Sequence, residues 1–449
     1  MKKYIFFVVG VMCTLLSHTV YAIDLNKSDA NIIGHVLEKK TGEHLPYMTV
    51  ALKGTTIGTM TDGTGHYFLK NLPEGEFILS VSAVGYKPQE RKVTLKRGKT
   101  LEENFELEED MVALDGVVVT ANRNETARRL APTLVKVVTP KLFDMTNSHT
   151  LSQGLVFQPG VRVENDCQNC GYSQVRINGM DGKYTQILID SRPIFSALAG
   201  VYGLEQIPAN MIERVEVVRG GGSALFGSSA IAGTVNIITK EPLRNSGSFA
   251  HSISNFDGSG SFDNNTTLNL SLVSSDNKMG AYIYGQNRHR SAWDSNGDGF
   301  SELPKLKNQT VGVNAYYRLS PYSKLNLEYH HMEEFRRGGN RFDLPPHIAE
   351  DANLNGSGKP GLVEQIEHSI NTGGLKFSAF SKDQKHSFNA YASAQHIVRD
   401  SYYSAYGHTT DFTGVLGAQY IYHFDKLFFM PSDLTGGALF DLLRERTHR

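Results

Sequence analysis

Residues 212–240, IERVEVVRGGGSALFGSSAIAGTVNIITK, decide the fold of this chain. A short alternating strand runs into three glycines and a segment rich in Gly, Ser and Ala, and a second strand follows. Glycine supplies backbone conformations that other residues resist, so the pattern predicts a strand, a tight turn and another strand. The glycines are not followed by Lys and Ser or Thr, and the segment lies between strands, which argues against a phosphate-binding loop.

The composition limits the classes of protein to which the chain can belong. It has 449 residues, 40% hydrophobic and 20% charged, with a formal net charge of -1. These values exclude a basic nucleic-acid binder and an acidic disordered tail, so we expect no nucleic-acid partner. The 43 glycines and 20 tyrosines, beside a single tryptophan, favour turn-rich β structure over helix bundles.

The first residues have the pattern of a secretory signal peptide, which we assign to residues 1–22. Lys2 and Lys3 precede a short apolar run. A cleavage site with small residues, ending at Ala22, follows that run. The run is shorter than the roughly 18 residues that a membrane-spanning helix needs. An exported protein without a helical anchor is periplasmic, secreted or a β-barrel.

Residues 31–108 predict a small β domain, because short alternating strands are separated by Gly, Pro and Asp turns. The spacing of IIGHVLE, GTMTD, GHYFLKNL and GEFILSVSAVGY resembles the carboxypeptidase-regulatory-like β-sandwich over nearly the whole region. That module is non-catalytic, so the resemblance implies an accessory periplasmic domain and no peptidase.

Residues 130–241 resemble the plug domain of TonB-dependent outer-membrane receptors, of the siderophore and cobalamin type. The resemblance is carried, in order, by LSQGLVFQPGVRV, by QVRINGMDGKYTQILIDSRPI and by the run from residue 207 to residue 240. In that family these segments build an α+β domain, with a small mixed sheet, that fills the lumen of a barrel.

Residues 115–121, in the sequence LDGVVVTANR, resemble a TonB box, the segment that pairs with the energy-transducing partner TonB. An extended β-branched peptide gains main-chain hydrogen bonds by adding to an exposed sheet edge. The residues assigned to this role are Asp115, Val117, Val118, Val119, Thr120 and Ala121.

Residues 246–449 alternate between polar and apolar side chains in segments of about ten residues, as membrane barrels require. Leu268, Leu270 and Leu272 are predicted to face lipid, while Asn269 and Ser271 face the lumen. Tight turns at 275–278, 320–323 and 381–384 alternate with longer predicted loops at 291–308, 335–367 and 399–411. That asymmetry is typical of outer-membrane barrels, with the long loops outside the cell.

About eight strands are expected in this last region, whereas plugged outer-membrane transporters use about 22. An open sheet in lipid would leave backbone N–H and C=O groups at its edges unpaired. Each unpaired group would cost several kcal/mol of free energy. We therefore expect the chain to be the N-terminal part of a longer receptor, C-terminally truncated, with an incomplete antiparallel barrel.

Two cysteines remain after the signal, Cys167 and Cys170, and an oxidising compartment favours a local disulfide between them. By resemblance, the loop that carries them is an apical plug loop facing the incoming ligand, and the second apical loop spans residues 196–202. A staple without ligand contact is the alternative. The residues predicted to contact ligand are Cys167, Gln168, Asn169, Cys170, Tyr172, Ser196 and Tyr202.

Residues 294–302, DSNGDGFSE, have oxygen ligands at alternate positions and two glycines that permit a sharp turn. The spacing resembles the first half of a calcium loop, although Lys305 stands where an EF-hand has its last glutamate. We expect a structural Ca²⁺ here and no required cofactor, the alternative being a polar surface loop. The predicted ligands are Asp294, Asn296, Asp298, Glu302 and the carbonyl of Phe300.

Sixteen histidines raise the question of haem or metal capture. His330 and His331 point to opposite faces of a strand and cannot chelate one ion together, and scattered histidines are the better interpretation. Arg336 and Arg337 predict a charged loop base or a contact to an anionic ligand. No catalytic motif and no paired nucleophile and base is present, so we expect no enzyme and assign no catalytic residue.

The resemblance implies an outer-membrane TonB-dependent receptor that binds and imports a scarce ligand. A metal chelate such as a siderophore, haem or cobalamin is the first expectation. The alternatives are a glycan importer that works with a surface lipoprotein, and a non-transporting periplasmic protein made of sandwich and plug. Expected partners are TonB with its inner-membrane complex, outer-membrane lipid and the ligand.

Overall fold

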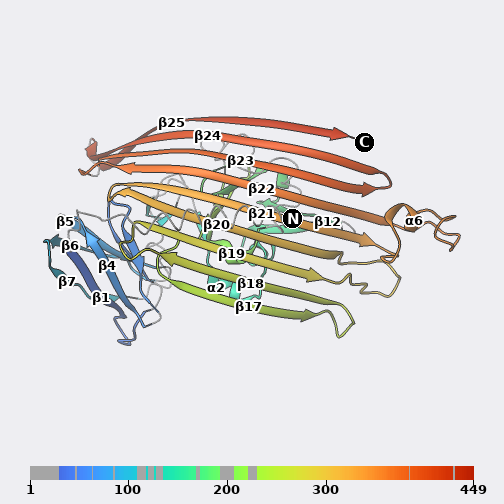
Figure 1. Cartoon of the computed structure of the whole chain (residues 1–449), viewed down its shortest axis with the longest axis horizontal. Helices are drawn as coiled ribbons and strands as arrows, with labels where there is room; N and C mark the ends of the chain where they lie inside the picture. The colour runs from blue at the N-terminus through green and yellow to red at the C-terminus, as the bar shows by residue number, and fades with distance from the viewer. Residues whose placement is uncertain are drawn as a thin grey trace.

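The fold is seen in a computed structural model (Figure 1). It describes residues 30–45, 48–62, 64–83, 86–108, 118–119, 126–127, 135–167, 172–192, 207–220, 230–383, 385–427 and 430–448. The predicted signal peptide lies outside these residues. Within them, no helix is long and apolar enough to cross a membrane.

The N-terminal domain is a sandwich of two four-stranded sheets. Alternating apolar residues of both sheets form its core, including Ile32, Leu69, Leu79 and Phe105, all fully buried. One sheet consists of β4 (His66–Leu72), β1 (Ala30–Glu38), β7 (Thr100–Glu102) and β8 (Phe105–Leu107). The other consists of β3 (Gly58–Met60), β2 (Thr49–Leu52), β5 (Gly75–Ser82) and β6 (Gln89–Leu95).

Gly34 lies where β1 is flanked by β4 on one side and by β7 and β8 on the other, and a β-carbon there would lie 1.8 Å from the carbonyl oxygen of Glu103. We predict that Gly34→Ala destabilises the sandwich by about 3 kcal/mol, because backbone atoms would have to move. Chemical unfolding of the chain measures this loss. Gly42→Ala, in an open turn with φ of +71°, is the comparison; an equal or larger loss there would contradict the prediction.

The central domain is built on a four-stranded mixed sheet with the order β11-β15-β16-β14. These strands are β11 (Val135–Val138), β15 (Ile212–Arg219), β16 (Gly233–Thr239) and β14 (Thr185–Ile189), with only β14 parallel to its neighbour. A hairpin of β12 (Val161–Cys167) and β13 (Tyr172–Ile177) and two short helices, α2 (Pro140–Met145) and α3 (Leu151–Leu155), complete it. The antiparallel β15 and β16 confirm the two strands that residues 212–240 predict.

The remainder of the chain is one antiparallel sheet of nine strands in consecutive order. The strands are β17 (Ser246–Asn255), β18 (Phe262–Val273), β19 (Met279–Arg290), β20 (Lys305–Ser320), β21 (Ser323–Gly339), β22 (Val363–Phe380), β23 (His386–Tyr403), β24 (Tyr406–Leu427) and β25 (Met430–His448). The pattern predicts about eight. The ninth is β25, which pairs along its length with β24 although its alternation is weak. The sheet is open, with β17 and β25 as its edges.

The register separates the two faces of this sheet by chemistry. One row of directly paired residues is wholly apolar: Leu272, Ala281, Ala315, Leu327, Leu375, Ala392, Leu416 and Phe440. The row beside it, on the opposite face, is mostly polar: Ser271, Tyr282, Asn314, Glu328, Gly374, Ser393, Val415 and Asp441. Side chains one residue apart on a strand point to opposite faces. The apolar face, here called the outer face, contains Leu268, Leu270 and Leu272 as the sequence predicts.

The connections differ between the two rims of the sheet. Short turns join β18 to β19, β20 to β21 and β22 to β23, as predicted. On the other rim, residues 291–304 and 340–362 form long connections, the second with the short helix α6 (Pro346–Glu350). The predicted loop at 399–411 is wrong, because β23 and β24 continue through it and only Ser404 and Ala405 join them. Polar residues on both faces there hide the alternation of the two strands.

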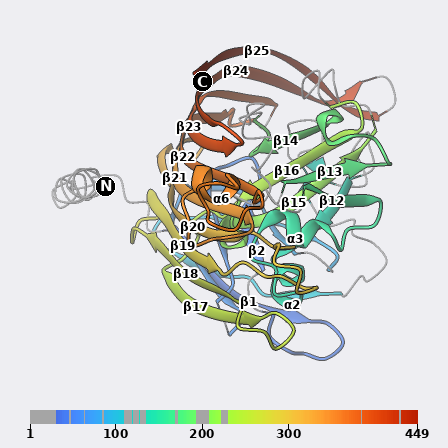
Figure 2. The ribbon, with the colours of Figure 1, turned by 90° about the vertical axis from the view of Figure 1, so that its right-hand side faces the viewer.

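The three parts of the chain are packed together. The nine-stranded sheet curves around the central domain, as Figure 2 shows from the long-loop rim. The sandwich lies at the short-turn rim (Figure 1), where the backbone N–H of Thr56 donates to the carbonyl of Pro321 at 2.9 Å. Tyr322 packs on the sandwich core. The sandwich and the long loops therefore occupy opposite ends of the sheet.

Candidate functional site

The central domain packs on the inner face of the nine-stranded sheet. Tyr282 and Tyr284 of β19 belong to the hydrophobic core of the central domain. The hydroxyl of Tyr282 donates to the carbonyl of Asn210 at 2.9 Å, and that of Tyr284 lies 3.0 Å from Nδ1 of His330. The inner face thus serves as the docking surface of the central domain.

Arg192 makes a buried polar contact between the two parts. The residue is 3% exposed, and its guanidinium forms an ion pair with Glu328 of β21 and donates to Oγ of Ser393 in β23 at 3.1 Å. Asp190 lies 3.5 Å away on the same turn. Burial acts to lower the pKa of Arg192, but Glu328 and Asp190 outweigh it and the pKa is raised. The charge is therefore retained although the group is buried.

Two consecutive residues in the left-handed region aim Arg192 at the sheet. Asp190 and Ser191 have φ of 47° and 66°, which is uncommon for residues other than glycine. Side-chain bonds from the neighbouring strand β16 hold them: Thr239 donates to the Asp190 carboxylate at 2.8 Å, and Asn236 accepts from the Ser191 N–H at 2.9 Å. The turn therefore fixes the direction of the guanidinium.

Gly374 provides the space that Arg192 occupies. Glu328, Gly374 and Ser393 are directly paired across β21, β22 and β23. A β-carbon at Gly374 would lie 2.4 Å from Oε1 of Glu328 and 2.7 Å from Nη1 of Arg192. The sheet thus has a notch into which one side chain of the central domain fits.

The predicted TonB box is described only in part. Val118 and Val119 form β9, which pairs antiparallel with β10 (Thr126–Ala127). Asp115, Val117, Thr120 and Ala121 lie outside the described residues. The extended conformation of the two valines fits a segment that pairs by strand addition, and the role of the box stays a prediction.

The predicted ligand-contacting loops lie mostly outside the described residues. Cys167 ends β12 and Tyr172 begins β13, and the two residues are paired by their backbones. Gln168, Asn169, Cys170, Ser196 and Tyr202 lie outside. The disulfide between Cys167 and Cys170 and the contacts to ligand stay predictions.

The acidic loop on the long-loop rim brings three predicted calcium ligands together. Carboxylate oxygens of Asp294, Asp298 and Glu302 lie within 4.8 Å of one another. Asp294 accepts from the N–H of Gly297 and of Gly299, each at 2.7 Å, which shapes the turn. Each carboxylate oxygen keeps a further acceptor position, so the donor set fits a hard cation. The amide of Asn296 donates to Asp298 at 3.1 Å, and the part of the Phe300 carbonyl stays a prediction.

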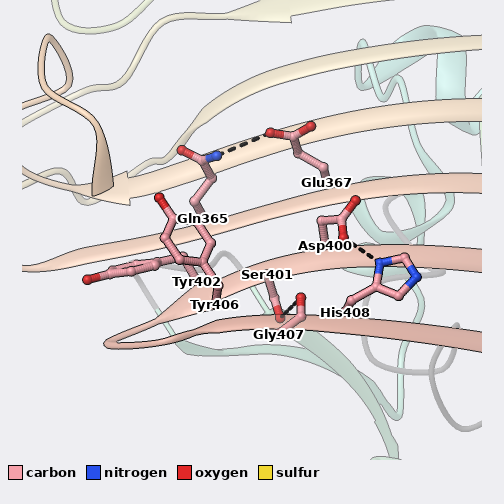
Figure 3. A pocket seen from close by; sticks show the side chains of 8 residues that line it. All are labelled: Gln365, Glu367, Asp400, Ser401, Tyr402, Tyr406, Gly407 and His408. Atoms are coloured by element: carbon pink, nitrogen blue, oxygen red, sulfur yellow. Dashed lines mark hydrogen bonds and ion pairs between the residues drawn. The ribbon is translucent and has the colours of Figure 1, made fainter. Parts of the chain in front are cut away.

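A cavity of about 540 Å³ opens on the outer face near the long-loop rim (Figure 3). Glu367, Asp400 and His408 are directly paired on three adjacent strands, and His408 bonds Asp400 at 2.6 Å. These residues share the face of Leu375 and Leu416, while the central domain packs on the opposite face. The cavity therefore lies on the other side of the sheet from the central domain.

Two family models match the chain. The TonB-dependent receptor plug domain matches residues 127–234, and the CarboxypepD_reg-like domain matches residues 32–119. The central domain is a TonB-dependent receptor plug. The sandwich before it is a carboxypeptidase-regulatory-like domain.

Curated relatives of the chain are vitamin B12 transporters. The chain is 35% identical over 229 residues to BtuB of Vibrio vulnificus strain YJ016, covering 44% of this chain and 37% of that protein. It is 37% identical over 128 residues to BtuB of Photobacterium profundum, covering 28% and 20%. The chain thus spans well under half the length of the curated relatives it matches.

Solved structures share the fold of plug and sheet. The siderophore receptor PirA of Acinetobacter baumannii matches with a TM-score of 0.58 at 20% identity, over 70% of this chain and 48% of that one. A mutant of the ferric enterobactin receptor PfeA of Pseudomonas aeruginosa matches with 0.57 at 19%, over 72% and 50%. At these identities the similarity concerns the fold alone. In that fold a plug packs on the inner face of strands that resemble the start of a receptor barrel.

Residues that the sequence alone did not single out carry the docking of the plug. Arg192 lies just after the strand Thr185–Ile189, and Glu328 lies on β21 next to the outward-facing Leu327. A charge at a position that alternation places on the lumen face was the only signal in the sequence. Arg336, predicted as a loop base, is 1% exposed beside Glu334. His330 and His331 do face opposite sides, bonding Tyr284 and Asn371.

Proposed function

We propose that this chain is part of an outer-membrane receptor that captures a metal chelate outside the cell and imports it with energy from TonB. The observation that carries the proposal is a plug domain docked on the polar face of strands whose other face is apolar. A soluble protein has little reason to expose Leu327, Leu416 and Phe440, which are 51%, 58% and 70% exposed.

The mechanism follows from this arrangement. Ligand binds to the long loops and to the plug apex, while the outer face lies in outer-membrane lipid. TonB, held by its inner-membrane complex, adds as a strand to the segment around Val118 and Val119, which must first leave β10. The pull then rearranges the plug, and the bonds of Arg192 to the sheet are among those that resist it.

The ligand we propose first is a corrinoid, because the curated relatives are named as vitamin B12 transporters. Ferric siderophores come second, since solved receptors for them share the fold. Outer membranes containing this chain, from cells without their own corrinoid and siderophore receptors, are titrated with labelled cyanocobalamin, a ferric catecholate and maltoheptaose. Saturable cyanocobalamin binding at least 100-fold tighter than the other two is expected, and Tyr202→Ala should weaken it at least tenfold.

Each other outcome decides against part of the proposal. Tighter binding of the ferric catecholate would support the assignment as a receptor but contradict the proposal that its ligand is a corrinoid. Preference for maltoheptaose would support the glycan importer, which the CarboxypepD_reg-like domain favours and which would work with a surface lipoprotein. If none of the three ligands binds at 10 μM and the chain is in the soluble fraction, the result would support the periplasmic alternative. The nine paired strands argue against that alternative.

We further propose that the acidic loop holds one structural Ca²⁺ through Asp294, Asn296, Asp298, the Phe300 carbonyl and Glu302. Added Ca²⁺ is expected to protect residues 291–304 from proteolysis, because the ion links both ends of the loop. Asp298→Asn should weaken Ca²⁺ binding, followed by calorimetry, at least tenfold. Asp257→Asn, on another connection of the same rim, is the matched control and should leave it unchanged. Equal binding by all three proteins would reject the site.

A further inference from the structure

Three imidazole rings meet on the sandwich, although the histidines were expected to be scattered. His35 and His66 are directly paired across β1 and β4, and His44 comes from the turn after β1. The ring centroids of His35 and His44 are 5.3 Å apart, those of His35 and His66 5.8 Å, and those of His44 and His66 4.9 Å. Residues separated by up to 31 positions thus form one surface cluster, here called the histidine trio.

The backbone holds the three residues close together. Gly65 has φ of +78°, and a β-carbon there would lie 2.7 Å from Cβ of His44, so glycine allows the turn to approach β4. The N–H of Leu45 donates to Val36 at 2.8 Å, and the N–H of Val36 donates to Gly65 at 3.0 Å. The main chain is fixed by these bonds, whereas the rings of His44 and His66 are exposed.

A hydrogen-bonded chain sets the tautomer of His66. The Thr64 hydroxyl donates to Oδ1 of Asp62 at 2.6 Å and lies 3.1 Å from Nδ1 of His66. Since the hydroxyl has one proton and gives it to the carboxylate, Nδ1 of His66 must be the donor. Nε2 of His66 therefore presents a lone pair, as a metal-binding histidine requires.

We propose that the histidine trio binds one divalent transition-metal ion of the class that prefers imidazole, namely Zn²⁺, Ni²⁺ or Cu²⁺. With metal–nitrogen bonds of about 2.0–2.1 Å, two imidazoles on a tetrahedral ion have centroids about 5 Å apart. The three observed separations lie around that value. The ring nitrogens are not all within 4.8 Å of one another here. We infer that the rings of His35 and His44 rotate to close the site, while His66 keeps its bond to Thr64. A fourth position stays open for water or another ligand.

The proposal rests on the sandwich alone and does not depend on transport. The test uses the full chain, purified in detergent without a polyhistidine tag, in competition with a chromogenic chelator for Zn²⁺. One Zn²⁺ per chain with a submicromolar dissociation constant is expected. The triple variant His35→Gln, His44→Gln, His66→Gln should lose it, and each single variant should weaken it at least tenfold. His251→Gln, an exposed histidine of β17, is the control and should bind as the parent does.

Two further measurements separate a metal site from rings that merely touch. Cu²⁺ bound by the chain should give an electron paramagnetic resonance spectrum with coupling to nitrogen ligands, absent in the triple variant. Thr64→Ala should weaken Zn²⁺ about tenfold by freeing the His66 tautomer, and Thr64→Ser should restore it. Unchanged Zn²⁺ affinity in the triple variant, or no binding at 100 μM Zn²⁺, would overturn the proposal.

Discussion

Replacing Arg192 with alanine is expected to destabilise the docking of the plug by about 3–5 kcal/mol, because it leaves Glu328 buried without its counter-charge. The bond to Ser393 is lost as well, and the turn at Asp190 and Ser191 loses the contact it supports. Denaturant unfolding followed by tryptic cleavage of the plug measures the change.

Matched variants distinguish the loss of this contact from a general effect of removing a charge. Arg162→Ala removes another plug arginine, but its ion pair with Glu164 is 3.1 Å long and Arg162 is 75% exposed, so the loss should stay below about 1 kcal/mol. Gly374→Ala should act like Arg192→Ala, because its β-carbon displaces the guanidinium. The double variant Arg192→Ala, Glu328→Gln should recover part of the loss. A loss below 1 kcal/mol for Arg192→Ala would show that the notch does not anchor the plug.

Placing an arginine at Leu327 is expected to reduce the stability of the sheet in lipid by about 2–4 kcal/mol. Leu327 belongs to the apolar row and lies between Leu325 and Tyr329 on the outer face of β21. The fraction of chain assembled in lipid bilayers, followed by heat-modifiable mobility and urea unfolding, measures the effect. In a soluble protein the exposed Leu327→Arg change would be nearly neutral.

Glu333→Arg is the matched control on the same strand and the same face. It lies six residues toward the long loops, about 20 Å further along β21, beside the polar residues Gln309 and Ser369. A charge at that height should cost about 0–1 kcal/mol. Equal effects of Leu327→Arg and Glu333→Arg would mean that the outer face does not lie in lipid.

The sequence predicted the fold well wherever one local rule decided the structure. Period-two alternation placed Leu268, Leu270 and Leu272 on one face, and glycines marked the connection between β15 and β16. Period-two alternation failed as a guide at residues 399–411. There β23 and β24 extend past the apolar part of the outer face, and both of their faces are polar. Alternation reports burial on one side, so a strand with two polar sides is read as a loop.

The candidate site was harder to predict, because its contacts join residues far apart in the chain. Arg192 and Glu328 are 136 positions apart and Arg192 and Ser393 are 201 apart; only the register of β21 to β23 brings the partners together around Gly374. The histidine trio likewise depends on the pairing of β1 with β4. The three carboxylates of the acidic loop lie within nine residues, so their closeness could be predicted from spacing alone.

The contact of the chain with TonB tests the central claim most directly. A cysteine is placed at Val119 and, as control, at the exposed Thr94 of the sandwich, and each chain is combined in cell envelopes with TonB that carries one periplasmic cysteine. A disulfide to TonB at position 119, in the outer-membrane fraction, increased by the ligand and absent at position 94, is the predicted result. Equal cross-linking at both positions, or none with the chain in the soluble fraction, would contradict the assignment as a TonB-dependent receptor.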